Sequence, residues 1–304
     1  MGIALRILTP ILIASGLAFA ALIPPIYLDT VVAIGHMEPA AEKTARWVTT
    51  GSGFLYGWLA QANADPAKRQ YEVYLVTNRH VIADSAVVLF RMNTNNSAGK
   101  GRIFKVPAKD WFAHQDPTVD VAATRINWDV LVGQNIKTVF IPSDQMAATA
   151  EKMKEIGVTE GDRVFVLGFP MNLAGVERNY TIVRPGSIAR VGDLLEAVNR
   201  YFLIDSHVFP GNSGGPVVLE PNDFHITNTK GNSRPFLIGM VKDFIPYRDV
   251  AISPQTKRAR ISFEENSGLS EVVPIDRIDE AIKAWRGSLP AAQQPPLKAA
   301  PETK

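Results

Sequence analysis

The sequence of 304 residues contains no cysteine and no excess of charge of either sign. The missing cysteine excludes disulfides, thiolate catalysis, iron–sulfur clusters and cysteine-ligated zinc. Thirty-two basic and thirty acidic side chains leave a formal charge of +2, which gives no electrostatic basis for nucleic acid as a partner. Apolar residues make up 46% and charged residues 20%, so the chain is globular and long enough to bury a core in one or two domains.

Residues 7–28 carry no charged side chain and follow Arg6. As a helix, this run spans about 33 Å, enough for a bilayer core of about 30 Å. We expect residues 1–28 to be an uncleaved membrane anchor; the main alternative is a signal peptide cleaved after Ala20, the last residue of a small-x-small pattern. A buried helix of the globular domain is a third alternative, disfavoured because Pro24 and Pro25 would break it. The anchor and the signal peptide both place the remaining chain across the membrane from the cytoplasm, because the short leading flank is basic. Residues 29–48 are predicted to be a linker.

The body of the chain consists of short β-rich runs separated by turn residues. In the run YEVYLVT, residues Tyr71, Val73, Leu75 and Thr77 share one face. We predict strands at 53–59, 71–77, 86–91, 121–126, 163–168, 180–183, 201–204, 216–219 and 236–241. Helices are predicted at 144–156, capped by Ser143, and at 275–286. The tail 287–304 is rich in Pro and Ala and is predicted to be disordered.

The segment most indicative of chemistry is Gly211-Asn212-Ser213-Gly214-Gly215-Pro216. In acyl transfer, a nucleophilic hydroxyl must be exposed at a tight turn, with backbone N–H groups directed at the oxyanion that forms. The glycines permit that backbone, and the amides of Gly211 and Ser213 could donate to the oxyanion. A structural Gly-rich turn between strands has the same pattern, so the motif alone leaves both interpretations open.

A serine nucleophile requires a base, and the chain has five histidines. His36 and His225 lie in segments that we expect to be solvated. His80 directly follows the predicted strand 71–77, where an imidazole is both held and exposed, although a half-buried structural histidine would sit there equally well. The other two are His114 and His207.

The third group should be a carboxylate that fixes the imidazole tautomer. Asp120 precedes the apolar run 121–126, which would bury it, whereas Asp116 lies in a polar stretch. A metal site at His114, Asp116 and Asp120 is disfavoured because no further cluster of His or acidic ligands lies nearby.

Taken together, the sequence resembles the bacterial trypsin-like serine peptidases of the chymotrypsin fold, related to the high-temperature-requirement (HtrA) branch. The order His80, Asp120, Ser213 is that of this family. Further matching pieces are spread from Gly51 to Val241: Gly51-Ser52-Gly53-Phe54, Val76-Thr77-Asn78-Arg79-His80-Val81-Ile82, Asp120-Val121-Ala122, residues 161–170, and Leu237-Ile238-Gly239-Met240-Val241. The chain departs from the HtrA pattern in having no PDZ domain after the last predicted helix.

The resemblance implies an all-β fold of two perpendicular six-stranded antiparallel β-barrels. The first barrel would cover residues 49–142, the second barrel with a C-terminal helix 157–286, and 143–156 would link them. His80, Asp120 and Ser213 would be catalytic, with the amides of Gly211 and Ser213 as oxyanion hole. The substrate pocket would be lined by His207, Val241, Lys242 and Asp243. The expected activity is serine endopeptidase on proteins or peptides, with no metal or organic cofactor.

Two alternatives remain at the sequence level. The first is a membrane-tethered, non-catalytic domain that keeps the trypsin-like fold and binds a peptide or protein. The second concerns the loop 249–267, whose basic cluster Lys257-Arg258-Ala259-Arg260 is either a solvated face or a contact with a membrane surface or an acidic partner. For location, the resemblance implies an inner-membrane anchor with the domain in the periplasm or cell exterior, or secretion if residues 1–20 are cleaved. The sequence does not determine the oligomeric state.

Overall fold

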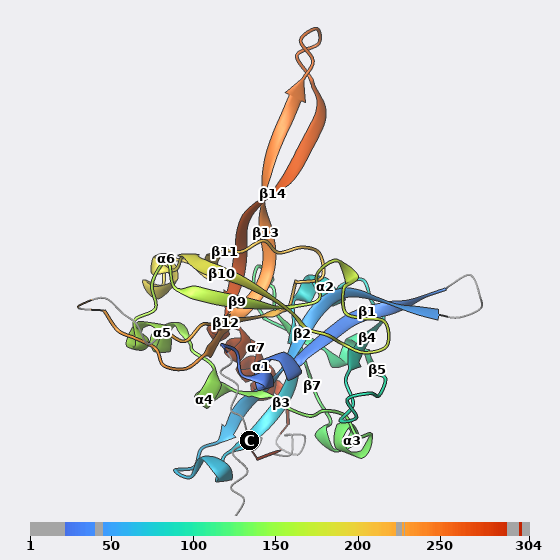
Figure 1. Cartoon of the computed structure of the whole chain (residues 1–304), viewed down its shortest axis with the longest axis vertical. Helices are drawn as coiled ribbons and strands as arrows, with labels where there is room; N and C mark the ends of the chain where they lie inside the picture. Colours follow the sequence, from blue (N-terminus) through green and yellow to red (C-terminus); the bar gives the residue numbers. More distant parts are fainter. Residues whose placement is uncertain (1–21, 40–44, 223–226, 228, 291–297, 300–304) are drawn as a thin grey trace, which may run out of the picture.

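Two β units form the body of the molecule, with a long β-hairpin that projects away from them (Figure 1). The computed structural model describes residues 22–39, 45–222, 227, 229–290 and 298–299. Every strand segment predicted above overlaps a strand of the structure. The all-β prediction is therefore confirmed, whereas the number of strands in the first barrel is not.

The first unit is an open sheet, where we predicted a closed six-stranded barrel. Its strands follow the order β5-β4-β1-β2-β3-β7-β6, with β8 paired to β2 and β15 to β3. Within the described residues, β5 and β6 are the two ends of this path, so the sheet curves without closing. Its strands are β1 (Val31–Pro39), β2 (Ala45–Gln61), β3 (Gln70–Thr77), β4 (Val87–Met92), β5 (Arg102–Pro107), β6 (Phe112–Ala113), β7 (Ala122–Arg125), β8 (Ile141–Pro142) and β15 (Lys298–Ala299). The short helices η1 (Pro66–Lys68), α2 (Arg79–Ile82), η2 (Ala108–Asp110) and α3 (Trp128–Gly133) lie between them.

The first unit also begins earlier than predicted. Residues 29–48, expected to be a linker, contain β1 and the start of β2, which pair antiparallel from Val31↔Phe54 to Pro39↔Ala45. Val31, Val32, Ala33 and Ile34 are all buried, because β1 also pairs with β4 on its other side. A segment with such a row of buried apolar residues cannot act as a linker.

Strand β3 shows why the period-two pattern was informative. Tyr71, Val73 and Leu75 face the core of the first unit, as predicted. The intervening Tyr74 and Val76 point the other way, into a core shared with the second unit. Since both faces are covered, the strand that leads to His80 is rigidly held.

The second unit is a closed barrel of six antiparallel strands, as predicted. The strand order is β10-β11-β14-β13-β12-β9, and its interior is filled mostly by aliphatic side chains with Phe202 and Phe236. Its strands are β9 (Arg163–Gly168), β10 (Ile182–Arg190), β11 (Phe202–Asp205), β12 (Pro216–Leu219), β13 (Phe236–Ile252) and β14 (Ala259–Pro274). The short helices η3 (Pro170–Asn172) and α6 (Gly192–Leu195) lie in its connections.

The segment between the units is two short helices rather than the single helix 144–156 predicted. Helix α4 (Ser143–Met146) ends where Ala147 forms a bridge to Leu237 and the Ala148 amide donates to the Leu237 carbonyl at 2.8 Å. Helix α5 (Ala150–Ile156) then begins at Thr149, whose side chain accepts from the Lys152 amide. The backbone pairing of Ala147 and Ala148 with Leu237 therefore outweighs the helical propensity of residues 144–156.

The C-terminal helix α7 (Ile275–Ser288) follows β14 but packs against the first unit. Arg286 makes a bidentate ion pair with Glu72, with both N···O distances 2.8 Å, and the Glu72 side chain is fully buried. Trp285 stacks on Phe112 with centroids 4.5 Å apart. Helix α7 therefore connects the second unit, from which it continues, to the first unit. The ion pair contributes to this connection, since removing one partner of a buried ion pair costs about 3–5 kcal/mol.

Of the predicted tail 287–304, Gly287 and Ser288 end α7, and Lys298–Ala299 pairs with β3 as β15. The remaining residues beyond 290 lie outside the described part.

The end of the N-terminal apolar run is packed into the globule. Helix α1 (Pro25–Asp29) places Tyr27 at 0% exposure, and its hydroxyl donates to the Pro235 carbonyl at 2.9 Å. Ile23, Ile26 and Leu28 contact the shared core. Within the described residues, no helix has the length and apolarity to cross a membrane. The last residues of the predicted membrane segment 7–28 therefore belong to the folded domain. Its first fifteen residues lie outside the described residues.

Candidate active site

His80 lies in the one-turn helix α2, directly after β3. Asn78, at the N-terminal boundary of this helix, is fully buried, and its amide nitrogen donates to the Asp120 carbonyl at 2.8 Å. This contact joins the end of β3 to the segment before β7, so the two residues that the sequence singled out come from elements held side by side.

Both carboxylate oxygens of Asp120 accept hydrogen bonds from His80. Its Oδ2 lies 2.6 Å from the imidazole Nδ1, and its Oδ1 accepts from the His80 backbone amide at 3.1 Å. The imidazole side chain is 50% exposed and the carboxylate only 15%. This arrangement fixes the ring orientation and leaves Nε2 as the nitrogen available to a third group.

The contact between His80 and Asp120 raises the pKa of the histidine and lowers the pKa of the aspartate. The hydrogen bond that His80 donates to Asp120 raises the pKa of His80 above its usual value, against the effect of partial burial. Burial acts to raise the pKa of Asp120, but the hydrogen bonds from the His80 ring and backbone hold it below its usual range. Asp120 is therefore ionised wherever His80 is neutral and able to accept a proton.

The other candidate residues have separate partners. Asp116 accepts hydrogen bonds from the Thr118 hydroxyl at 2.7 Å and from Arg200, and these lower its pKa to about 2. His114 Nε2 lies 3.1 Å from Glu280 Oε2. The described residues contain no group of three or more His, Asp or Glu side chains able to hold a metal ion.

Ser213 follows a tight turn over Phe209–Asn212. The Asn212 amide donates to the Phe209 carbonyl at 2.9 Å, Pro210 occupies the second position and Gly211 the third, with φ +99°. This is the sequence pattern of a type II turn, which requires a positive φ at its third residue. A Cβ at Gly211 would also lie 2.4 Å from the Phe169 carbonyl oxygen, so only glycine fits here.

The orientation of the peptide between Pro210 and Gly211 is fixed by a second loop. The Pro210 carbonyl accepts a hydrogen bond from the Met171 amide at 2.7 Å. Because C=O and N–H point in opposite directions across a trans peptide, the Gly211 N–H is turned away from Met171. Within the described residues, neither the Gly211 nor the Ser213 amide donates to a protein acceptor.

Ser52, in β2 of the first unit, holds the serine loop of the second. Its amide donates to the Ser213 carbonyl at 2.8 Å, and its hydroxyl donates to the Gly211 carbonyl at 2.7 Å. Thr77, three residues before His80, donates to the Ser52 carbonyl at 2.7 Å. A Cβ at Gly214 would clash with both Ser52 O and Thr77 Oγ1, at 2.1 and 2.3 Å, so the strand that leads to His80 and the loop that carries Ser213 are in direct contact.

The resemblance of Gly51–Phe54 to the family predicts no role for Ser52. The only available signal was a small polar residue between two glycines, in a run that otherwise becomes apolar.

Strand β13, which carries Val241, Lys242 and Asp243, lies beside the serine loop. Val241 and the glycine pair exchange backbone hydrogen bonds, from the Gly214 amide to Val241 O at 3.0 Å and from the Val241 amide to Gly215 O at 2.9 Å. Lys242 pairs with Glu271 at 2.6 Å, and its ammonium lies 4.3 Å from the centroid of the Tyr201 ring. The next residue, Asp243, is exposed.

Lys242 and Asp243 also act on the catalytic candidate pair. The negative charge of Asp243 contributes to raising the pKa of His80, and the positive charge of Lys242 acts in the opposite direction. Tyr201, under the Lys242 ammonium, donates its hydroxyl to the Thr118 carbonyl, two residues before Asp120.

His207 is exposed rather than enclosed. Its ring lies beside Gly268 of β14, where a Cβ would come within 3.3 Å of Cε1, and the same Cβ would be 3.6 Å from Asp205 Oδ1. A histidine in this position retains contact with water in the unliganded molecule.

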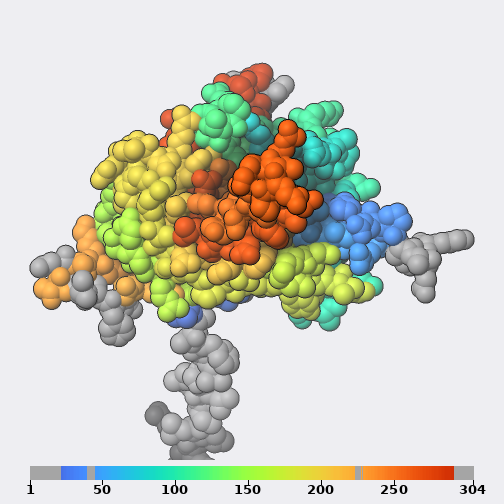
Figure 2. Space-filling model, turned by 90° about the horizontal axis from the view of Figure 1, so that it is seen from above, coloured from blue at the N-terminus to red at the C-terminus, as the bar shows by residue number. Residues whose placement is uncertain are grey.

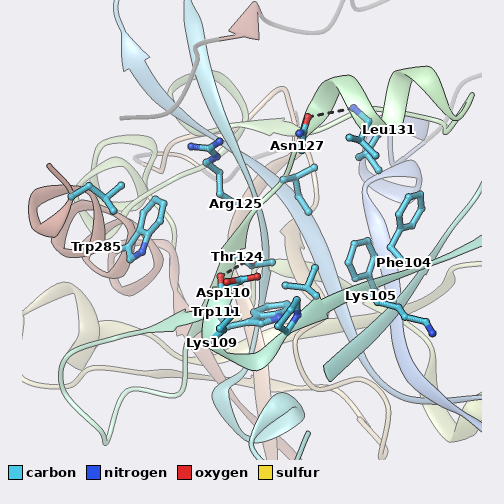
Figure 3. A pocket seen from close by; sticks show the side chains of 16 residues that line it. Phe104, Lys105, Lys109, Asp110, Trp111, Thr124, Arg125, Asn127, Leu131 and Trp285 are labelled. Carbon is cyan, nitrogen blue, oxygen red and sulfur yellow. Dashed lines mark hydrogen bonds between the residues drawn. The ribbon is translucent and has the colours of Figure 1, made fainter. Parts of the chain in front are cut away.

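A separate cavity of about 590 Å³ opens in the first unit, away from these residues (Figure 3). It lies between β5 and β7, which lie near the ends of the open sheet path, and is bordered by α3 and by Trp285 of α7. Phe104, Arg125 and Leu131 are among its lining residues. The cavity therefore occupies the gap left where the sheet does not close, and none of His80, Asp120 and Ser213 borders it.

A family model for the trypsin-like peptidase domain matches residues 51–223, more than half of the chain. The chain belongs to the trypsin-like peptidase family. The matched range contains His80, Asp120 and Ser213, which confirms the resemblance predicted from the sequence. No curated protein matches the chain.

The chain is also similar to solved structures of proteins named as proteases. The apo MamO protease domain from Magnetospirillum magneticum has a TM-score of 0.44 at 16% identity, with 83% of this chain and 95% of that chain covered. The active form of the Rv3671c protease from M. tuberculosis has a TM-score of 0.42 at 16% identity, covering 91% and 93%. Its inactive form has a TM-score of 0.41 at 18% identity, covering 86% and 92%.

Proposed function

We propose that the protein is a serine endopeptidase in which Ser213 is the nucleophile, His80 the general base and Asp120 the orienting carboxylate. The observation that carries the proposal is the His80–Asp120 pair, with its 2.6 Å contact and its second hydrogen bond from the His80 amide. A binding domain has no need of an imidazole held in one tautomer by a mostly buried carboxylate. A general base does, because the ring must present an unprotonated Nε2 to the serine hydroxyl.

The proposed reaction uses these three side chains in the following order. His80 takes the proton from the Ser213 hydroxyl as the oxygen attacks a peptide carbonyl, and Asp120 stays ionised and stabilises the imidazolium that forms. His80 then returns the proton to the leaving amine, which leaves an acyl-enzyme. Water repeats the attack with His80 again as base. The residues supply all the proton transfers, so the mechanism requires no metal or organic cofactor.

The amides of Gly211 and Ser213 are proposed to bind the tetrahedral oxyanion. The Met171–Pro210 hydrogen bond supports this role, since it keeps the Pro210 carbonyl away and turns the Gly211 N–H to the opposite side. Donors already aimed at the developing charge need no reorganisation during the reaction, and the loss of one such donor costs a factor of about 10²–10³ in kcat in a serine peptidase.

For substrates, we propose peptide segments without a strong preference for Lys or Arg before the scissile bond. In trypsin-like enzymes that select basic residues, an aspartate lies six positions before the nucleophile, and here that position is His207. An imidazole does not compensate the burial of a cationic side chain. Small apolar residues are the first choice and acidic residues that pair with His207 the second, with Val241, Lys242 and Asp243 lining the same region.

We further propose that the domain is exported, to the periplasm or cell exterior. The packing of Ile23, Ile26, Tyr27 and Leu28 into the core leaves only residues 7–21 of the uncharged run for a membrane, about 22 Å as a helix, short of the roughly 30 Å of a bilayer core. This shortening favours a cleaved signal peptide over the inner-membrane anchor that the sequence alone favoured, because the apolar residues after Ala20 are accounted for by their packing in the core.

The experiment that tests the activity compares turnover of an unstructured protein substrate by the wild type and by Ser213→Ala. The proposal expects hydrolysis by the wild type and almost none by the variant at unchanged circular dichroism. Equal turnover by both would reject Ser213 as the nucleophile. A wild type that binds peptides without cleaving them would favour the non-catalytic binding domain instead.

A further inference from the structure

The β13–β14 hairpin continues well beyond the barrel that it helps to close. Antiparallel pairing runs from Gly239↔Pro274 in the barrel to Ile252↔Ala259 near the tip. The segment 249–267, predicted to be a loop, therefore forms most of the part of this hairpin that lies beyond the barrel. It projects from the body in Figure 1 and is viewed nearly end-on in Figure 2. Every residue of 247–252 and 259–265 is exposed.

This outer hairpin, residues 247–265, exposes apolar side chains on both faces. Ile252 is 62% exposed, Ile261 56% and Phe263 52%, and Tyr247 and Val250 are also exposed. The pairs Ala251↔Ile261 and Asp249↔Phe263 put Ile261 and Phe263 on one face, whereas Val250↔Ser262 puts Val250 on the other. A two-stranded ribbon is at best marginally stable alone in water, so a ribbon with apolar residues on both faces is expected to have a partner.

The charges of the outer hairpin are segregated along its length. Residues 250–263 carry three basic side chains, Lys257, Arg258 and Arg260, and no acidic one. The root, residues 247–249 and 264–265, carries Asp249, Glu264 and Glu265 with one basic residue, Arg248, which pairs with Glu264 at 3.0 Å. The hairpin thus has a basic tip, an apolar middle and an acidic root.

We propose that this outer hairpin is an interface with a second copy of the chain, in which two hairpins lie antiparallel about a twofold axis. In that arrangement the basic tip of each copy meets the acidic root of the other, and the two apolar middles meet at the axis. A twofold interface uses the same patch on both copies, so it requires a self-complementary surface. The tip-to-root order of charge on this ribbon has that property.

The two partners considered from the sequence fit the pattern less well. If the hairpin entered a bilayer end-on, Lys257, Arg258 and Arg260 would go deepest, ahead of the apolar residues, which is costly. An acidic protein partner would complement the tip but would meet like charge at Asp249 and Glu265. A second copy satisfies both ends at once.

Because the natural chain has no cysteine, a single introduced cysteine reports on this contact in the full-length protein. Ala251 lies between tip and root and is paired with Ile261, so Ala251→Cys should fall near the twofold axis and crosslink to its copy with a short bismaleimide. The matched control is Val198→Cys, a position 78% exposed in the second unit outside the hairpin. Crosslinked dimer should form with the first variant and not with the second.

Charge reversal then tests the antiparallel arrangement. In the Ala251→Cys background, Arg258→Glu with Arg260→Glu, or Asp249→Lys with Glu265→Lys, should each lower the yield of dimer by roughly tenfold, since like charges then face each other. Combining all four substitutions should restore it. The Arg248–Glu264 pair is left intact throughout.

The proposal would be overturned by equal crosslinking at Ala251→Cys and Val198→Cys, by a yield insensitive to either reversal, or by no recovery in the combined variant. Crosslinking that requires added anionic vesicles would also overturn it, and would point to the lipid surface. Hydrolysis plays no part in these readouts, so the outcome is independent of whether Ser213 is a nucleophile.

Discussion

The Pro210 carbonyl oxygen accepts a hydrogen bond from the Met171 amide at 2.7 Å, and this contact sets the orientation of the Gly211 peptide. Met171 and the following Asn172 both adopt positive φ, 52° and 59°, which is uncommon for non-glycine residues. Asn172 is held there because its side-chain oxygen accepts from the Thr49 amide at 2.6 Å. The first unit therefore supports a strained turn whose backbone positions the proposed oxyanion hole of the second.

The first prediction concerns this turn. Met171→Pro removes the amide that holds Pro210 and, because a proline φ is fixed near about −65°, it also prevents the positive φ of this turn. We therefore expect kcat to fall about tenfold to a hundredfold with little change in KM, because oxyanion contacts act in the transition state. Met171→Gly keeps the amide and suits a positive φ, so it should retain wild-type kcat. Steady-state kinetics on a peptide substrate, with circular dichroism for the fold, measures both. An equal loss of kcat in the two variants would show that kcat depends on the Met171 side chain rather than on its amide.

The second prediction concerns the His80–Asp120 pair. Asp120→Asn should lower turnover on the order of 10⁴, because an amide lets the imidazole adopt the wrong tautomer. His80→Ala should be as damaging as Ser213→Ala, and the double variant no worse than either, since the two act as one unit. His114→Ala, which removes a side chain paired with Glu280 rather than with His80 or Asp120, should stay within about tenfold of the wild type. Additive losses in the double variant would contradict a shared role.

The pH dependence of kcat/KM should reveal the charges around His80. The hydrogen bond to Asp120 raises the pKa of His80, so the acid limb should lie above the usual histidine pKa, since the base must be neutral. Asp243 adds to this shift and Lys242 opposes it. Lys242→Met should therefore move the limb to higher pH, and Asp243→Asn to lower pH. Shifts in the same direction in both variants would show that the limb reports another group.

Specificity can be tested on a peptide library. We expect no dominance of Lys or Arg before the scissile bond, because His207 occupies the position at which an aspartate selects for them. His207→Ala should change which peptides are cut more than how fast the best one is cut. Cleavage mainly after Arg by the wild type would overturn the assignment of this position to the pocket.

The N-terminus of the mature protein tests the revised view of location. Since Tyr27 and its neighbours belong to the core, we expect processing after Ala20 and a new terminus at Ala21. N-terminal sequencing of protein recovered from the periplasm or medium measures this. An intact Met1 in protein that stays with the membrane would support the anchor.

How much could be predicted from the sequence depended on how local the determinants were. Strand β3, the C-terminal helix and the His80, Asp120 and Ser213 motifs are encoded in short patterns of polarity and glycine. The helix predicted over 144–156 failed because Ala147 and Ala148 find backbone partners on β13, which no local pattern reveals.

The predictions of a linker at 29–48 and a loop at 249–267 were wrong for a similar reason. Residues 31–34 are short apolar stretches next to a longer apolar run, and only their pairing with both β2 and β4 identifies them as a strand. The outer hairpin has mixed polar and apolar residues because it stands free of the core. The turn at Met171 escapes sequence analysis altogether, since a positive φ at methionine is imposed by contacts from a distant strand.

The most direct test of the account is the reaction of the purified protein with a fluorophosphonate, followed by intact mass and peptide mapping. A hydroxyl activated by His80 and facing a formed oxyanion hole reacts with this probe, whereas an ordinary serine does not. We predict one adduct per chain, located on the peptide that contains Ser213, and none in Ser213→Ala or His80→Ala. A folded wild-type protein that forms no adduct, or forms it at another residue, would contradict the serine peptidase assignment.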